Sequence, residues 1–191
     1  MAGGKTLFMD HIEKHMDLVR TFAELYADPL VEMANQVTRA FREGARLFIF
    51  GNGGSAADAQ HIAAEFINKM TRERKPLPAI ALTTDSSVLT CISNDISFED
   101  VFSRQLAALG STGDLALGIT TSGNSPNIFK GIEKAAELGM TTFAFLGGDG
   151  GLLKGRADYE IFIPHRDTPR IQEIHILAGH ILCRLVEEKF V

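Results

Sequence analysis

The feature that most constrains the fold is a regular alternation between short apolar runs and longer stretches with helical spacing. The apolar runs are typical of buried strands and read RLFIF (46–50), PAIALTT (78–84), DLALGIT (114–120), MTTFAFLG (140–147) and YEIFIP (159–164). Helical spacing follows four of them, at residues 55–70, at 86–93 with 98–109, at 125–138 and at 169–189. Strands that alternate with helices in this way predict a parallel sheet in a three-layer α/β sandwich.

The N-terminal segment has a helical pattern throughout. Apolar residues recur every three to four positions over residues 6–26, which predicts an amphipathic helix. Pro29 is predicted to end that helix and to open a second one that runs to Glu43. We therefore expect a single domain over residues 1–191, with two helices at 1–44 as an N-terminal extension that packs on the sheet or on a partner chain.

Composition excludes several classes of protein. The chain has 191 residues, 45% of them hydrophobic, and a net charge of -5, which suits one globular domain. The densest basic run, Arg72, Arg74 and Lys75, predicts a solvated loop rather than a nucleic-acid surface. Cys91 and Cys183 lie among apolar residues, which predicts buried thiols in a reducing compartment. No membrane-length apolar run and no apolar leader segment are present, so we expect a cytoplasmic protein without nucleic-acid or membrane partners.

Two loops are rich in glycine and hydroxyl residues, and ligands of parallel α/β sheets bind where such loops leave the strands. GNGGS at 51–55 lets the backbone approach a ligand and leads into a helix whose N–H groups favour an anion. TTSGNSPN at 120–127 supplies several hydroxyls, although Ser125 is also a good helix cap. A dinucleotide site would need an acidic residue about 20 positions after the first loop, and Asp85 lies about 30 positions away. The two loops together predict a site for a phosphate monoester.

Three stretches also carry a family resemblance. GNGGSAADAQH with its following glutamate, TTSGNSPN and RIQEIHILAGH occur in this order, and together they resemble the sugar isomerase (SIS) domain family and, within it, the phosphoheptose isomerases. The likeness covers essentially the whole chain. It implies a five-stranded parallel sheet flanked by helices, a homotetramer, and zinc, one ion per subunit. The implied reaction converts D-sedoheptulose 7-phosphate into D-glycero-D-manno-heptose 7-phosphate, the first step toward the nucleotide-activated heptoses of lipopolysaccharide and other bacterial surface polysaccharides.

The resemblance also implies which residues form the site. Positions that match the family's metal ligands are His61, Glu65, Gln172 and His180. Positions that match its substrate contacts are Asn52, Gly53, Gly54, Ser55, Glu65, Asn94, Asp95, Thr120, Thr121, Ser122, Ser125 and Gln172. Lys69 stands where an arginine is common, and lysine lacks the bidentate geometry with which arginine binds phosphate. This departure bears on substrate affinity more than on reaction type.

An aldose–ketose isomerase moves a proton between C1 and C2 through an enediol or enediolate, so it needs a base and an acid. Following the family, Glu65 is the expected base and His180 the expected acid. A zinc ion could instead polarise the carbonyl, and ligation would lower the basicity of Glu65, so the two roles compete. Asp58 could orient the ring of His61, or it could simply favour the helix dipole. The remaining histidines are expected to be structural or supporting (His175) or to lie on the surface (His11, His15 and His165).

Two other classes of function remain possible on this pattern. SIS-fold regulators that bind the bacterial replication initiator have a similar sequence, but the ones this chain resembles lack the acid/base pair at Glu65 and His180. A nicotinamide enzyme is disfavoured by the missing acidic residue after the first loop.

The spacing of two proposed ligands bears on assembly. Gln172 and His180 lie eight residues apart on one predicted helix, which places them about 12 Å apart along its axis. Metal–ligand distances are only about 2 Å. We therefore expect a site built between protomers, with at least one of its residues supplied by a neighbouring chain.

Overall fold

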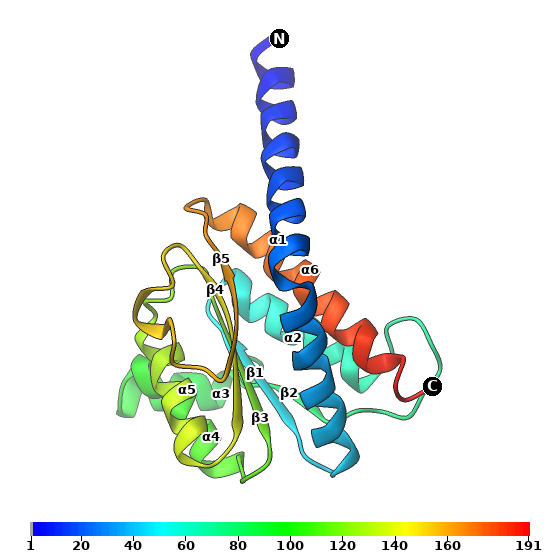
Figure 1. Cartoon of the computed structure of the whole chain (residues 1–191). Helices are drawn as coiled ribbons and strands as arrows, with labels where there is room; N and C mark the ends of the chain where they lie inside the picture. Colours follow the sequence, from blue (N-terminus) through cyan, green and yellow to red (C-terminus); the bar gives the residue numbers. More distant parts are fainter. Residues whose placement is uncertain (1) are drawn as a thin grey trace.

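The computed structural model describes residues 2–191 and contains a five-stranded sheet with helices on both faces (Figure 1). The strands are β1 (Leu47–Gly51), β2 (Ala79–Ala81), β3 (Leu115–Thr120), β4 (Thr141–Gly147) and β5 (Tyr159–Ile163). Their order is β2-β1-β3-β4-β5 and every pairing is parallel, so the predicted fold is confirmed. The strand order reverses direction between β1 and β3, which is where sheets of this kind bind ligands.

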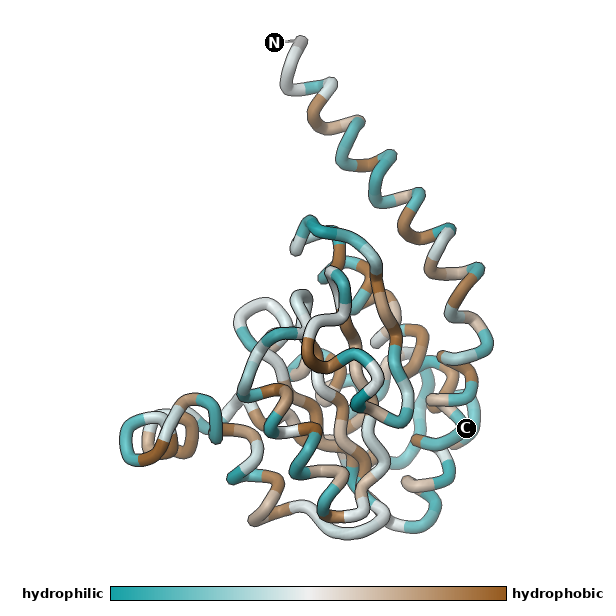
Figure 2. Tube along the Cα trace, turned by 60° about the vertical axis from the view of Figure 1, so that its left-hand side comes forward, coloured by the Kyte–Doolittle hydropathy of each residue, from teal (hydrophilic) through white to brown (hydrophobic). Residues whose placement is uncertain are grey.

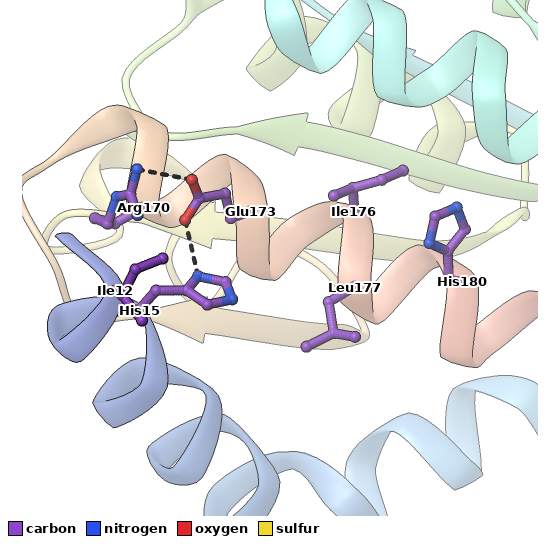
Figure 3. Close-up of a pocket in the computed structure, with 7 residues that line it drawn as sticks. All are labelled: Ile12, His15, Arg170, Glu173, Ile176, Leu177 and His180. Carbon is purple, nitrogen blue, oxygen red and sulfur yellow. Dashed lines mark ion pairs between the residues drawn. The ribbon is translucent and has the colours of Figure 1, made fainter. Parts of the chain in front are cut away.

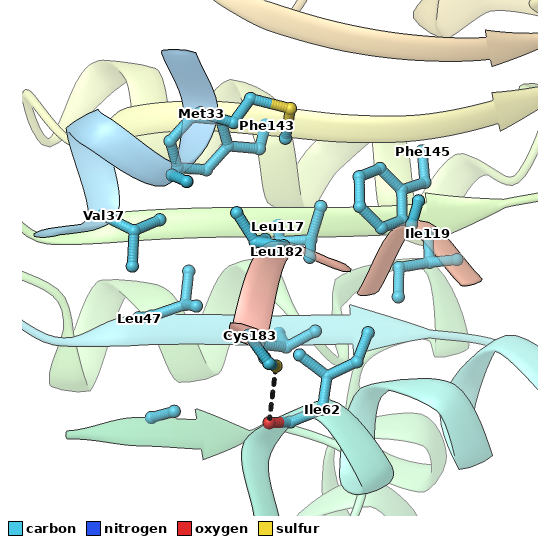
Figure 4. Close-up of a cluster of buried hydrophobic side chains, with 14 of the residues drawn as sticks. Met33, Val37, Leu47, Ile62, Leu117, Ile119, Phe143, Phe145, Leu182 and Cys183 are labelled. Atoms are coloured by element: carbon cyan, nitrogen blue, oxygen red, sulfur yellow. Dashed lines mark hydrogen bonds between the residues drawn. The ribbon is translucent and has the colours of Figure 1, made fainter. Parts of the chain in front are cut away.

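The helices cover both faces of the sheet. They are α1 (Ala2–Arg42), α2 (Gly54–Ile67), α3 (Ser86–Asp95), α4 (Ser103–Leu109), α5 (Pro126–Glu137) and α6 (Thr168–Glu187), with 3₁₀ turns at Phe98–Asp100 and Gly151–Leu153. Alternate strand residues point to opposite faces. Leu47 and Leu117 face a core that α1, α2 and α6 complete (Figure 4), whereas Phe48 and Phe50 face one completed by α4 and α5. None of the helices within residues 2–191 is both long and apolar enough to cross a membrane.

α1 is one continuous helix, so the predicted division into two helices at Pro29 is wrong. Pro29 is exposed, and a proline inside a helix removes one backbone hydrogen bond, which by itself favours a break. Packing on both sides holds the helix together, because Phe22, Leu30 and Met33 are buried in the core beside α6. The second half of α1 is therefore part of the α/β unit. Its first half projects from the body and carries exposed apolar side chains, namely Leu7, Phe8, Met9, Ile12 and Met16 (Figure 1, Figure 2).

The two cysteines lie in different environments. Cys183 is buried in α6, as predicted, and desolvation there raises the pKa of its thiol. Cys91 is exposed on α3, a helix in which no residue is buried, so its predicted burial is wrong. The apolar neighbours that suggested burial, Leu89 and Ile92, are only partly buried against the core.

Candidate active site

The loops after β1 and β3 lie side by side at the carboxyl edge of the sheet, and two asparagines join them. Asn52 donates from Nδ2 to Oδ1 of Asn127 over 2.9 Å, and Asn127 donates back to Oδ1 of Asn52 over 2.8 Å. Asn127 is only 2% exposed, so this pair is largely shielded from water. The role of Asn127 was not predicted, because its position in TTSGNSPN does not reveal a partner 75 residues away. The pair fixes the spacing between the two predicted phosphate loops.

The first loop requires glycine at two neighbouring positions for two different reasons. Gly53 has a φ of +56°, in the left-handed region that favours glycine, and α2 begins directly after it. A Cβ on Gly54 would collide with the side-chain amide of Gln172, which reaches the loop from α6. Ser55 is 3% exposed, whereas Gly53 and Gly54 are exposed. The surface that this loop offers to a ligand is therefore mainly backbone at the positive end of the α2 dipole.

The second loop gathers hydroxyl groups at the start of α5. The hydroxyls of Thr120 and Ser125 lie 3.3 Å apart, and the N–H of Gly123 donates to Thr120 Oγ1 over 3.3 Å. Ser125 precedes α5 but makes no capping hydrogen bond, so its expected role as a cap is not realised and its hydroxyl turns toward Thr120. Thr121 and Ser122 line an adjoining cavity of about 530 Å³ that also contains the exposed Arg166.

Three side chains from α2 and α6 converge about two helical turns beyond the first loop. His61 and Glu65 are one turn apart on α2, and His61 Nε2 lies 3.3 Å from Glu65 Oε1. His180 comes from α6, and its Nε2 lies 3.3 Å from His61 Nε2. The two imidazole rings meet edge to face. Glu65 and His180 of one chain thus belong to one cluster, so if a neighbouring chain completes the site, it supplies some other residue.

The donor set of this cluster suits a metal ion. The three ligand atoms, two imidazole nitrogens and a carboxylate oxygen, all lie within 4.8 Å of one another. Two Nε2 atoms that face each other can either share one proton or both direct lone pairs at a cation. Two histidines and one carboxylate are a known catalytic zinc set, with the fourth position left for water or substrate. Gln172 lies at Gly54 in the glycine loop, so the chain gathers three of the four predicted ligands without it.

Asp58 lies one turn before His61 on α2. Its Oδ2 is buried and has no hydrogen-bond partner among the described residues, so the expected bond that would orient the His61 ring is absent. Desolvation raises the pKa of Asp58 to about 6, although the nearby His61 opposes this shift. The helix dipole stabilises a carboxylate most in the first turn of a helix. α2 begins at Gly54, so Asp58 lies beyond that turn. Neither predicted explanation therefore accounts for this residue.

Several predicted site residues lie apart from the cluster. Asn94 and Asp95 are exposed at the end of α3, where Asn94 donates to Asp95 Oδ1 over 2.8 Å. No hydrogen bond or ion pair within residues 2–191 connects them to the cluster. Lys69 is exposed after α2 and pairs with Glu73. His175 is fully buried on α6, where its Nε2 donates to Leu146 O over 3.0 Å, which is a structural role.

A groove between α1 and α6 leads from the cluster to a second set of charged side chains (Figure 3). Glu173 Oε2 lies 2.8 Å from His15 Nδ1, and Glu173 Oε1 lies 2.7 Å from Arg170 Nη2. His15 therefore has a partner, contrary to its expected place as an isolated surface residue. The groove has a volume of about 400 Å³ and includes His180 at its other end.

Comparison with known proteins places these features in one family. Residues 10–147 match the SIS domain. A phosphoheptose isomerase of Aquifex aeolicus (strain VF5) is 54% identical over 167 residues, which cover 87% of each chain. Another, from Clostridium acetobutylicum, is 50% identical over 164 residues, which cover 86% of this chain and 84% of the relative.

Solved structures give the same result. The structure of a phosphoheptose isomerase from Francisella tularensis superposes with a TM-score of 0.93 at 34% identity, over 97% of this chain and 98% of that one. The enzyme from Neisseria gonorrhoeae superposes with a TM-score of 0.88 at 38% identity, over 96% of this chain and 98% of that one.

Proposed function

The chain belongs to the SIS-domain family, among its phosphoheptose isomerases, and we propose that Glu65 and His180 are the acid/base pair with which it works. It is an aldose–ketose isomerase that converts D-sedoheptulose 7-phosphate into D-glycero-D-manno-heptose 7-phosphate, the first step of nucleotide-activated heptose biosynthesis. The observation that carries the residue assignment is the convergence of a carboxylate from α2 and an imidazole from α6 in one cluster, with the glycine loop at the start of the same α2. The alternative, a non-catalytic regulator, has no support in the comparisons.

The proposed roles follow from what the isomerisation requires. Glu65 removes a proton from C1 of the ketose while His180 protonates the C2 oxygen, which gives an enediol. Returning a proton to C2 and removing the one on O1 then completes the aldose. His61, 3.3 Å from both partners, keeps the carboxylate and the second imidazole on the same side of the substrate. Accurate placement of such groups relative to the reacting carbon accounts for much of the rate that an enzyme supplies.

We propose that zinc binds to His61, Glu65 and His180. When bound, the ion would act as a Lewis acid toward the carbonyl oxygen. Gln172 was expected as a fourth ligand, but its contact with Gly54 supports a role at the sugar or phosphate instead. Ligation draws electron density from the Glu65 carboxylate, so the metal and base roles of this residue limit each other.

The phosphate end of the substrate is assigned to the paired loops. The backbone of Gly53 and Gly54 and the hydroxyls of Thr120, Ser122 and Ser125 supply hydrogen-bond donors, and the starts of α2 and α5 supply favourable dipoles. Lys69 is exposed and paired with Glu73, so in this chain it stands apart from both loops. The site therefore relies on neutral donors for phosphate, with Arg166 at the edge of the adjoining cavity.

We further propose that the enzyme is a cytoplasmic homotetramer whose sites are completed between protomers. The projecting half of α1 supports assembly, because an isolated amphipathic helix with exposed Leu7 (58%) and Phe8 (63%) is marginal in water. Asn94 and Asp95 support shared sites, because their exposed position on α3 leaves them free to reach a second copy. The single domain then comprises residues 1–191, with α1 serving both the core and the assembly.

The acid/base assignment is tested with Glu65→Gln and His180→Gln in a coupled assay with sedoheptulose 7-phosphate. Each variant removes one proton-transfer group while keeping its approximate size, so kcat should fall on the order of 10²- to 10⁴-fold. Glu73→Gln is the matched control, since Glu73 is exposed in the loop after the same helix and, within residues 2–191, its ion-pair partner is Lys69. Near-normal turnover of either site variant would refute its assigned role. The same assay with a chelator, and then with zinc restored, tests the metal.

A further inference from the structure

Arg74, in the loop between α2 and β2, caps the end of the helix that carries Glu65. Its Nη2 donates to the carbonyl oxygen of Glu65 itself over 2.7 Å, and its Nη1 donates to Phe66 O over 2.8 Å. Weaker bonds from Nη1 reach Asn68 O (3.2 Å) and Lys75 O (3.0 Å). The Arg74 side chain is 1% exposed, so the expectation that this basic run is entirely solvated is wrong. One buried guanidinium thus satisfies the last carbonyls of α2.

Glu187, near the end of α6, lies against the same guanidinium. Its Oε1 is 3.6 Å from Arg74 Nε, and its side chain is also 1% exposed. The carboxylate accepts hydrogen bonds from Met70 N over 2.9 Å and from Thr71 N over 3.1 Å and Thr71 Oγ1 over 2.9 Å. Burial favours its neutral form, but these hydrogen bonds outweigh burial and lower the pKa of Glu187. Glu187 is therefore ionised and anchors the loop after α2 to α6.

The Arg74–Glu187 pair joins the two helices that carry the catalytic groups. On the α2 side, Arg74 donates a hydrogen bond to the backbone carbonyl of Glu65. On the α6 side, Glu187 lies seven residues beyond His180, which is about 10 Å along the helix axis. A buried ion pair loses much of its attraction to desolvation and is weak evidence of a stabilising role alone. Its location, directly on the backbone of the proposed base, instead indicates that it sets position.

We propose that Arg74 is a positioning residue for the isomerisation. It fixes Glu65 relative to His180 by binding the end of α2 and the Glu187 carboxylate on α6. The inference rests on the proposed roles of Glu65 and His180. Small displacements of a catalytic group can cost about 10²-fold in rate. Lysine at this position keeps the charge, but its single ammonium lacks the planar fork that serves several carbonyls at once.

The first test compares Arg74→Lys, Arg74→Met and the matched control Arg72→Met. Arg72 lies two residues away in the same loop but is exposed, and the ion-pair partner of its side chain within residues 2–191 is Glu188, over 3.5 Å. We expect kcat to fall about 10- to 100-fold in Arg74→Lys and further in Arg74→Met, while the KM for sedoheptulose 7-phosphate stays within about 3-fold. Arg72→Met should keep both constants. Unchanged kcat in Arg74→Lys, or an equal loss in Arg72→Met, overturns the proposal.

A second comparison separates positioning from general loss of stability. Leu106→Ala removes a fully buried side chain from the opposite face of the sheet, away from α2 and α6. Assayed well below its unfolding midpoint, this destabilised variant should retain kcat, whereas Arg74→Lys should not. If both lose kcat alike, Arg74 has only a structural role. Glu65→Gln in the same series separates the proposed acid/base function from the positioning role. An active Glu65→Gln variant refutes the proposed function. An active Arg74→Lys beside an inactive Glu65→Gln refutes the positioning role alone.

Discussion

At the scale of single residues, the hydroxyls of the second loop are proposed to bind the phosphate, at the end of the substrate away from the reacting carbons. Ser122→Ala and Ser125→Ala should therefore raise KM by about 10-fold or more while kcat changes little, because each removes a hydrogen bond to a charged phosphate. Inorganic phosphate should compete with substrate in the unmodified enzyme. Because Ser125 makes no capping bond, Ser125→Ala should leave the denaturation midpoint unchanged. A fall in kcat at constant KM would move these residues to the reacting end.

His175 makes the stability of the fold sensitive to acid. Complete burial lowers its pKa from an ordinary 6.5 to about 4. Between these values the unfolded chain binds more protons than the folded one, so stability is present above pH 6.5 and is lost as the pH falls toward 4. The loss from this residue should be on the order of 3 kcal/mol.

His175→Gln, which keeps a donor for Leu146 O, provides the comparison. Denaturation curves measured between pH 7 and pH 4 should show a weaker pH dependence in the variant than in the unmodified protein. Parallel curves for the two proteins would mean that His175 does not contribute to the acid sensitivity.

At the scale of elements, α1 contains a proline that its packing tolerates. Pro29→Ala restores a backbone hydrogen bond at an exposed position in the helix interior, so the free energy of unfolding should rise by about 1–3 kcal/mol. Chemical denaturation measures this directly, with Ala27→Gly as a control of opposite sign in the same helix. A less stable Pro29→Ala protein would show that the core is adapted to a helix distorted at this point.

The elements of the fold show which features could be predicted from the sequence and which could not. The strands were predictable because each is a local apolar run, and the cluster of His61, Glu65 and His180 was implied by family resemblance. The continuity of α1 was not predictable, because the proline rule is local whereas Phe22 and Leu30 are held by α6. The pairing of Asn52 with Asn127 was missed for the same reason, and so was the burial of Arg74, which packs against the distant Glu187 as well as against nearby carbonyls.

At the scale of the whole molecule, the location of Glu65 and His180 in one cluster predicts the result of mixing inactive variants. Glu65→Gln mixed with His180→Gln should regain no activity after subunit exchange, because every site still lacks one of its own groups. Glu65→Gln mixed with Asp95→Ala should regain part of it, if α3 of one copy completes the site of another. Exchange is verified independently with differently tagged chains. Recovery in the first mixture, or none in the second, would contradict this arrangement.

The pairing of the two asparagines also bears on the deamidation of Asn52. Asn52 is followed by Gly53, and Asn-Gly is the sequence in which an asparagine side chain is most readily attacked by the next backbone nitrogen and hydrolysed to aspartate. Its amide is held by Asn127 through two hydrogen bonds of 2.8 and 2.9 Å, which restrain the rotation that this attack requires. A carboxylate at this position would repel the phosphate that the loop is proposed to bind. We therefore expect the contact that keeps the two loops together to slow the loss of the Asn52 amide as well, for as long as the chain stays folded.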